Sequence, residues 1–296
     1  MIPELKMDRI LFATDYLESS RLALDYAVAF AHQFKASVVM LHVVQLSQAA
    51  AEAELTSSGL SVSRREAQDR LEVLASGVRH TGLHVEAHIE DGDPSEEILK
   101  AVSVHRADLL VLGVHGVHRG VEHLLLGSNT EKILLSSTCP TLTVGAQVLA
   151  GFSVALHLRE ILYFSDFTAE AAAAASYAVL LGKALHVPVD VCQLLPSIAE
   201  NDFELRRKLA DEYSDTIRRA LPGWESEWCT PAFHLERGMK TEQMLARARS
   251  RSAGLIVLGV HAKSFLERHL HSSFAYQLLA NATCPIISIH HKARPA

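Results

Sequence analysis

The sequence predicts an α/β protein built from two copies of one domain, each with a parallel sheet covered by helices on both faces. The first observation is a repeat: ADLLVLGVHG at 107–116 returns as AGLIVLGVHA at 253–262, with seven of ten positions identical. The second is that short strand-like runs are apolar at every position, which is typical of strands buried on both faces. The third is a length of 296 residues, which favours two domains over one.

Two further segments repeat in the same order. DRILFATD at 8–15 matches REILYFSD at 159–166, and SSTCPTLTV at 136–144 matches NATCPIISI at 281–289. The offsets lie between 145 and 151 residues, so the whole unit is duplicated. We expect the first domain at 1–147, the second at 156–296 and the boundary within 148–157.

The first half of each unit alternates strand and helix. In the first copy, Ile10–Thr14 is a short apolar strand. Ser19–Gln33 has apolar residues at helical spacing, and Ser37–Val44 is a Val-rich strand. A long polar helix is expected over Arg64–Arg79.

The second half continues the alternation. His84–Ile89 is the third expected strand, and Asp93-Pro94-Ser95-Glu96 is a helix start, with Asp as cap and Pro at the first helical position. Leu109–Leu112 is the fourth strand. A helix over Thr130–Ser136 and a strand over Thr141–Val144 complete the unit. Such an alternation predicts a parallel sheet.

A parallel sheet of this kind binds ligands at the carboxyl ends of its strands, near the point where the strand order reverses. We therefore expect a site just after Thr14, after Val44 and after Leu112. Asp15 follows the first strand, where its carboxylate could accept from a ribose hydroxyl or hold a metal through water. The alternative is that Asp15 only caps the next helix.

The segment after the fourth strand contains the elements of an anion site. Gly113 and Gly116 remove side chains where backbone could approach a ligand. Gly127-Ser128 precedes a helix start, where free N–H groups and the helix dipole attract anions. The alternative is that the glycines only permit a turn and Ser128 only caps.

The segment from Gly113 to Ser128 resembles the pattern Gly-x2-Gly-x9-Gly-Ser/Thr, the ATP-binding motif of the universal stress protein family. The strand-end Thr-Asp, the Gly-Asp-Pro segment and the Cys-Pro-Thr-Leu closing strand resemble that family too. The resemblance implies two tandem Rossmann-like domains, each with a five-stranded parallel sheet. It also implies that the closing strands, Thr141–Val144 and Ile286–Ile289, pair the domains as a pseudo-two-fold dimer.

The resemblance further implies an adenine-nucleotide site in the first domain. Its residues would be Ala13, Thr14, Asp15, His42, Val43, Leu112, Gly113, His115, Gly116, Gly127, Ser128, Asn129 and Thr130. Two departures stand out: ten residues separate Gly116 from Gly127 where the motif has nine, and Ala13 replaces a frequent Pro.

The second copy departs further from the motif. Ala262 and Ser272 replace its second and third glycines, while Ser165, Asp166, Gly259 and Ser273 keep their places. We expect the first domain to bind nucleotide, and the second to bind weakly or to serve as a structural partner.

The net charge, the apolar segments and the cysteine pattern argue against several other classes of protein. A formal charge of −6 argues against a duplex nucleic-acid binder. No secretory signal is visible, and the apolar helix at 171–185 is too short to span a bilayer. The four cysteines form no Cys-x-x-Cys pair, which favours a reduced cytoplasmic setting, with Cys139 and Cys284 in the core.

Dedicated catalysis is not expected. His115, His118 and His123 are spaced by three and five residues, which does not favour a metal site, and no nucleophile or P-loop motif is present. The expected function is a cytoplasmic stress-response regulator that binds ATP or another adenine nucleotide, with or without Mg²⁺, and changes a surface read by a protein partner. The sequence does not decide whether two chains also form a homodimer. The alternatives are a nucleotide-free interaction module and a slow ATP hydrolase.

Overall fold

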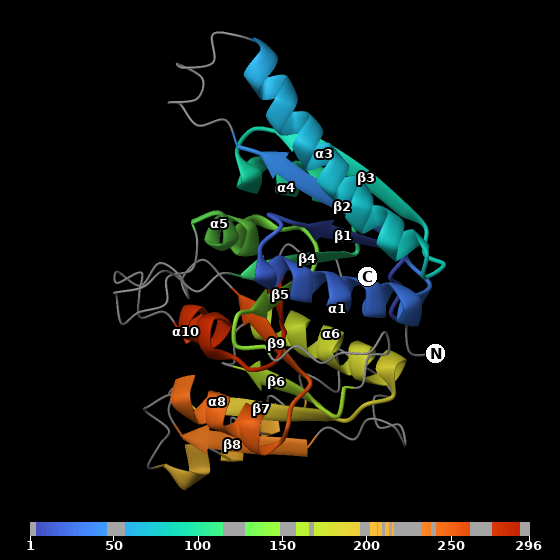
Figure 1. Ribbon diagram of the computed structural model, residues 1–296. Helices are drawn as coiled ribbons and strands as arrows, with labels where there is room; N and C mark the ends of the chain where they lie inside the picture. Colours follow the sequence, from blue (N-terminus) through green and yellow to red (C-terminus); the bar gives the residue numbers. More distant parts are fainter. Residues whose placement is uncertain are drawn as a thin grey trace.

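The computed structural model describes residues 4–45, 57–114, 128–148, 158–165, 169–195, 202–205, 207–208, 211–212, 215, 232–237, 241–260 and 274–290. Strands and helices alternate through the first domain (Figure 1). The elements of the first domain are β1 (Arg9–Ala13), α1 (Glu18–Phe34), β2 (Ser37–Val44), α3 (Ser57–Arg79), β3 (Val85–Asp91), α4 (Pro94–Val104), β4 (Leu109–Val114), α5 (Ser128–Ser136) and β5 (Thr141–Gly145).

The second domain repeats this order in its described part. Its elements are β6 (Ile161–Ser165), α6 (Ala169–Leu185), β7 (Val189–Leu195), β8 (Ala232–Arg237), α8 (Thr241–Ser250), β9 (Leu255–Val260), α10 (Phe274–Asn281) and β10 (Ile286–His290). The predicted elements are all present, most of them within two residues of the expected bounds. The largest difference is α3, which begins at Ser57 rather than Arg64.

The ten strands that the structure describes form one sheet, in the order β3-β2-β1-β4-β5-β10-β9-β6-β7-β8. Pairing is parallel within each half, and only β5 with β10 is antiparallel. Leu142 faces Ile287 at this junction, and the Thr143 hydroxyl donates to the Ile286 carbonyl at 3.2 Å. The expected union of two five-stranded parallel sheets through their closing strands is therefore confirmed.

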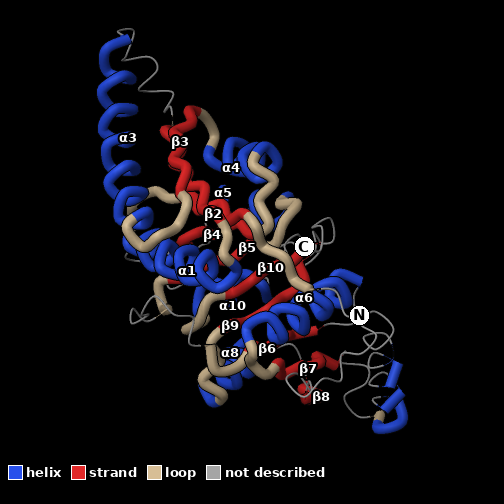
Figure 2. Tube along the Cα trace, turned by 90° about the vertical axis from the view of Figure 1, so that its right-hand side faces the viewer, coloured by secondary structure: helices blue, strands red, loops and turns tan. Residues whose placement is uncertain are grey.

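The sheet lies between two layers of helices (Figures 1 and 2). On one face, α1, α3 and α6 pack onto both halves and share a single apolar core, which includes Phe12, Phe30 and Tyr163. On the opposite face, α4 and α5 cover one core in the first domain, and α8 and α10 cover a separate core in the second. Leu134 of α5 packs into the second of these cores, so apolar contacts join the two domains on both faces of the sheet.

Local sequence explains where key helices begin and end. The Asp93 side chain accepts from the N–H groups of Ser95 and Glu96, and Pro94 opens α4, as predicted. α1 ends at Lys35, whose φ of 57° turns the chain towards β2. Cys139 and Cys284 are both buried, which confirms their expected place in the core.

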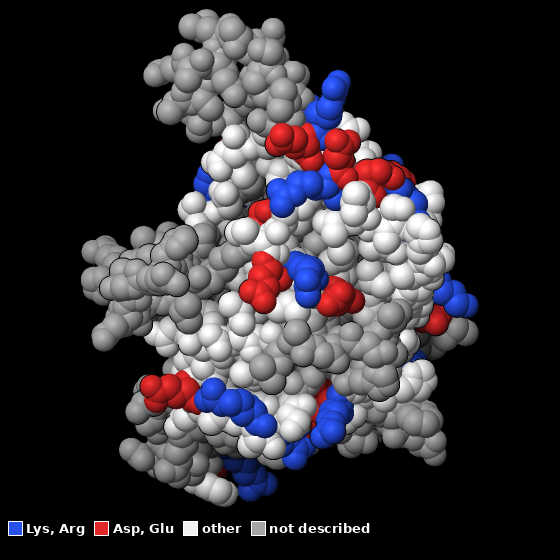
Figure 3. Space-filling model, in the orientation of Figure 1, with Lys and Arg blue, Asp and Glu red and all other residues white. Residues whose placement is uncertain are grey.

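Charged side chains are dispersed over the surface. On the face shown in Figure 3, basic and acidic residues of the described part alternate, with no continuous basic patch among them. In the part of the chain that the structure describes, no helix has the length and apolar character needed to cross a membrane.

Candidate functional site

A sharp turn links β1 to α1 at the carboxyl end of the sheet. The Thr14 N–H donates to the Leu41 carbonyl at 2.9 Å and so continues the hydrogen bonds between β1 and β2 by one residue. The Thr14 hydroxyl oxygen accepts from the Tyr16 N–H at 3.0 Å. Tyr16 has a φ of 64°, in the left-handed region that residues with side chains seldom adopt. The turn therefore holds a strained residue in place, a feature that clusters at functional sites.

Asp15 stands at the tip of this turn. Its Oδ1 accepts from the Leu17 N–H at 3.0 Å and from the Ser20 hydroxyl at 2.6 Å. The residue before α1 is Leu17, and it makes no side-chain capping bond. Asp15 therefore does not occupy the N-cap position of α1, although it makes a capping-type bond to the first helical turn through Ser20. Its carboxylate instead closes the turn and is held by the first helical turn.

His42 is fixed beside the same turn from the end of β2. Its Nδ1 lies 2.7 Å from the Thr14 carbonyl oxygen, and because a carbonyl only accepts, Nδ1 carries the proton. The imidazole packs on the Tyr16 ring at 4.4 Å between centroids, and the Arg70 guanidinium lies 5.0 Å from the Tyr16 centroid. Burial raises the pKa of Tyr16 to about 12, although the Arg70 charge opposes the shift. Tyr16 is therefore a neutral support for His42.

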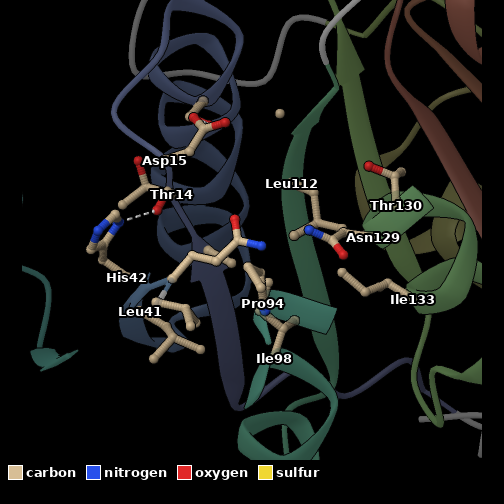
Figure 4. Close-up of a pocket in the computed structure, with 15 residues that line it drawn as sticks. Thr14, Asp15, Leu41, His42, Pro94, Ile98, Leu112, Asn129, Thr130 and Ile133 are labelled. Carbon is tan, nitrogen blue, oxygen red and sulfur yellow. Dashed lines mark hydrogen bonds between the residues drawn. The ribbon is translucent and has the colours of Figure 1, made fainter. Parts of the chain in front are cut away.

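The opposite side of the site comes from the end of β4 and the start of α5. In Figure 4, Asn129, Thr130 and Ile133 of α5 face Thr14, Asp15 and His42 across a pocket, and Leu112 lies between the two groups. α4 adds Pro94 and Ile98 from its first turn and a half. The N-terminal ends of three helices, α1, α4 and α5, thus border one space, which favours an anionic ligand.

These elements enclose a pocket of about 340 Å³, within the range of sites for small molecules. Its lining is Ala13, Thr14, Asp15, Ser20, Leu41, His42, Val43, Gln45, Pro94, Ile98, Leu112, Gly113, Asn129, Thr130 and Ile133. β1 is flanked by β2 on one side and β4 on the other, so the chain reverses direction across the sheet here. The pocket lies where the predicted switch point placed it.

Most of the predicted first-domain residues that the structure describes meet at this pocket. Ala13, Thr14, Asp15, His42, Val43, Leu112, Gly113, Asn129 and Thr130 line it. Ser128 starts α5 but is not part of the lining. His115, Gly116 and Gly127 lie outside the described residues, as do His118 and His123.

Sequence reasoning missed Ser20, Leu41, Gln45, Pro94, Ile98 and Ile133. A signal existed for Pro94, because a helix that follows a parallel strand starts at the carboxyl edge of the sheet, where the ligand was expected. Nothing in the spacing of Ile98 or Ile133 distinguishes them from ordinary core residues.

The proposed second site is described only at two backbone positions. Ser165 ends β6, and Gly259 is the second-last residue of β9, as Gly113 is of β4. Asp166, Ala262, Ser272 and Ser273 lie outside the described residues.

The fold and the pocket define a tandem α/β protein with two half-sheets joined edge to edge and a small-molecule pocket at a switch point. Comparison with protein families gives the family: the model of the Universal stress protein family matches residues 6–145 and 157–290. The chain belongs to the universal stress protein family, as its motifs suggested.

Individual relatives agree with this assignment. The chain is 30% identical over 141 residues to Universal stress protein MJ0531 of Methanocaldococcus jannaschii, which covers 46% of this chain and 81% of that protein. It is 28% identical over 153 residues to Universal stress protein MJ0577 of the same organism, covering 46% and 93%. Each of these relatives therefore matches about one domain's length of this chain.

A solved structure of similar length has the same fold. A universal stress protein from Archaeoglobus fulgidus superposes with a TM-score of 0.73 and 18% identity, over 97% of both chains. A functionally unknown protein from Pseudomonas aeruginosa gives a TM-score of 0.64 and 17% identity, over 96% of this chain and 92% of the other. The architecture therefore extends to tandem proteins of very different sequence.

Proposed function

We propose that the first domain binds an adenine nucleotide, and that this binding lets a cytoplasmic stress-response protein act as a regulator. The observation that carries the proposal is the pocket itself. It joins a strand-end carboxylate, Asp15, to the N-terminus of α5, directly after the glycine-containing segment that begins at Gly113.

Different parts of the pocket suit the base, the ribose and the phosphates of a nucleotide. Leu41, Val43 and Ile98 give an apolar wall suited to the faces of a base. The Asp15 carboxylate suits ribose hydroxyls or, through water, a magnesium ion bound to phosphates. Asn129 and Thr130, in the first turn of α5, offer backbone N–H groups and polar side chains to phosphate oxygens. A bound Mg²⁺ would neutralise phosphate charge, and no step of catalysis is assigned to it.

A titration of the full chain with ATP, ADP, AMP and adenosine by calorimetry tests the proposal. We expect the nucleotides to bind more tightly than adenosine, because the α5 N-terminus favours phosphate. Failure of all four to bind at millimolar concentration would overturn the proposal and leave the nucleotide-free interaction module.

A matched pair of substitutions assigns the binding to this pocket. Asp15→Asn keeps an acceptor for the Leu17 N–H and the Ser20 hydroxyl but removes the charge. It should weaken ATP binding about tenfold or more, since hydrogen bonds to charged groups contribute roughly 1.5–3 kcal/mol. Asp25→Asn makes the same change at an exposed position of α1 outside the pocket lining, and should leave affinity unchanged. Equal effects of the two would place the site elsewhere.

A further inference from the structure

A second cluster of side chains that can bind a metal lies near the amino ends of β3 and β4, whereas the nucleotide pocket lies at the carboxyl ends of the strands. Glu86, His88 and His105 each offer a ligand atom, and these atoms all lie within 4.8 Å of one another. All three residues are partly buried, so the cluster is fixed by packing and is still open to solvent. It uses none of the residues of the nucleotide pocket.

The three residues come from strand β3 and from the C-terminal end of helix α4. Glu86 and His88 alternate along β3 and therefore point to the same face of the sheet. His105 caps the C-terminus of α4, with its N–H bonded to the Ala101 carbonyl at 2.9 Å. The Arg9 guanidinium donates to the His105 carbonyl at 3.2 Å and ties this end of α4 to β1.

The side chains of the cluster lie close together. The imidazole rings of His88 and His105 lie 4.7 Å apart between centroids. His88 Nε2 lies 3.5 Å from Glu86 Oε2, within ion-pair distance of that carboxylate. The imidazole nitrogens and the carboxylate oxygen therefore converge on one point, as the donor atoms of a metal site do.

We propose that Glu86, His88 and His105 bind a divalent transition-metal ion such as Zn²⁺. Two imidazoles and a carboxylate are ligands that such ions take, and a catalytic-type or surface zinc site completes its shell with water. Metal–ligand bonds of about 2.0–2.2 Å place tetrahedral donors roughly 3.3 Å apart. The three donors already lie within 4.8 Å of one another, so rotation of the side chains is the adjustment that the proposal requires.

His84 lies at the edge of the cluster as a candidate fourth ligand. It precedes Glu86 by two residues, on the same side of the chain, and its Nε2 is 3.8 Å from Glu86 Oε1. The side chain is 74% exposed, so it can turn towards an ion bound by the other three. The C-terminus of α4 adds a negative partial charge from its carbonyl groups, whereas the Arg9 charge opposes a cation.

The second domain shows that the same corner of the fold accommodates a cation. The repeat aligns His105 with Arg251, whose guanidinium lies 2.6 Å from Glu160 and 3.8 Å from Asp190. Sheet register aligns Glu86 with Ala232 and His88 with His234. The second domain thus holds a permanent guanidinium charge at this corner, while the first has a set of neutral and acidic ligand groups.

The test is a Zn²⁺ titration of the tag-free full chain against a competing chromophoric chelator at neutral pH. His88→Ala and His105→Ala should each lose one Zn²⁺ equivalent relative to the wild type. His234→Ala is the matched control, because it removes a histidine at the equivalent strand position where Ala232 and Arg251 replace the partners. It should keep the wild-type stoichiometry.

Thermal unfolding separates metal binding from a purely structural role. Zn²⁺ should raise the melting temperature of the wild type relative to chelator, and His88→Ala should abolish that rise. Unchanged stoichiometry in His88→Ala and His105→Ala, or a rise that survives both changes, would overturn the proposal. Arg9→Gln keeps a donor for the His105 carbonyl and removes the repelling charge, so Zn²⁺ binding should tighten. An unchanged affinity would place the metal elsewhere.

Discussion

A side-chain carbon at Gly113 would lie 2.3 Å from the backbone nitrogen of Ser20. It would also lie 2.5 Å from the Ser19 carbonyl carbon, so the first turn of α1 already occupies that space. Neither neighbour is a flexible side-chain end that could move aside. Gly113 is therefore required by the packing of α1 against β4, in addition to any contact that it makes with a ligand.

Gly113→Ala should lower the free energy of unfolding by about 1–3 kcal/mol, the usual cost of overpacking a close contact. Urea unfolding followed by circular dichroism measures the change. Gly77→Ala is the control, because a side chain there meets nothing within 4 Å on helix α3. That change should be neutral or stabilising by up to about 1 kcal/mol, since Gly is a poor helix former. A neutral Gly113→Ala would contradict the steric argument.

The buried ion pair between Arg247 and Asp190 should be sensitive to the loss of one partner. The two side chains meet at 2.8 Å, and the Asp190 side chain is fully buried. Arg247→Met leaves the carboxylate without this cation and should cost about 3–5 kcal/mol. Lys208→Met, in an exposed pair with Glu212 at 3.8 Å, should cost at most about 1 kcal/mol. Similar losses in both variants would argue against a special role for the buried pair.

The buried thiols should resist alkylation in the native protein. Burial raises the pKa of Cys139 to about 11 and that of Cys284 to about 12, so both are neutral thiols near pH 8. Only the thiolate reacts quickly. Iodoacetamide labelling followed by peptide mass mapping should modify these positions in urea but not in buffer. Rapid labelling of either position in buffer would contradict the burial.

The same shifts predict weaker stability in alkali. In the folded state these thiols keep their protons above their ordinary pKa of 9.0, while the unfolded chain loses them. Stability therefore falls as the pH rises from about 9 towards 11, because the unfolded state binds fewer protons there. Unfolding midpoints measured between pH 8 and pH 11 should show a steeper fall for the wild type than for a Cys139→Ala, Cys284→Ala variant.

Tyr177 on α6 should tolerate the loss of its hydroxyl. The side chain is buried, and its hydroxyl oxygen has no hydrogen-bond partner among the described residues. Tyr177→Phe removes a polar group that is buried at a cost of about 1–3 kcal/mol, so the variant should be as stable as the wild type or more stable. Tyr16→Phe is the contrasting change, because the Tyr16 hydroxyl donates to the Ala67 carbonyl at 2.6 Å. It should destabilise the protein.

The strands were largely predictable, because buried parallel strands have an unbroken apolar pattern. Ser37–Val44 matches its predicted bounds in β2. The start of α3 was missed because Ser57–Ser63 is mostly small and polar, with no apolar periodicity to indicate a helix.

The candidate site was predictable where it depends on strand ends and not where it depends on packing between elements. Thr14, Asp15 and Leu112 follow from the rule for parallel sheets. Ser20 and Ile98 reach the pocket only through the way α1 and α4 lie across the sheet. The cluster of Glu86, His88 and His105 was missed for the same reason, since His105 is distant in sequence and meets β3 through the fold.

The antiparallel pairing of β5 with β10 has a consequence for how this protein assembles. Two separate chains joined through such strands would separate on dilution, whereas a covalent connection holds the pair at a high effective concentration. Union of the halves is then independent of how much protein the cell makes. The connected halves then stay paired through β5, β10 and the apolar core that they share.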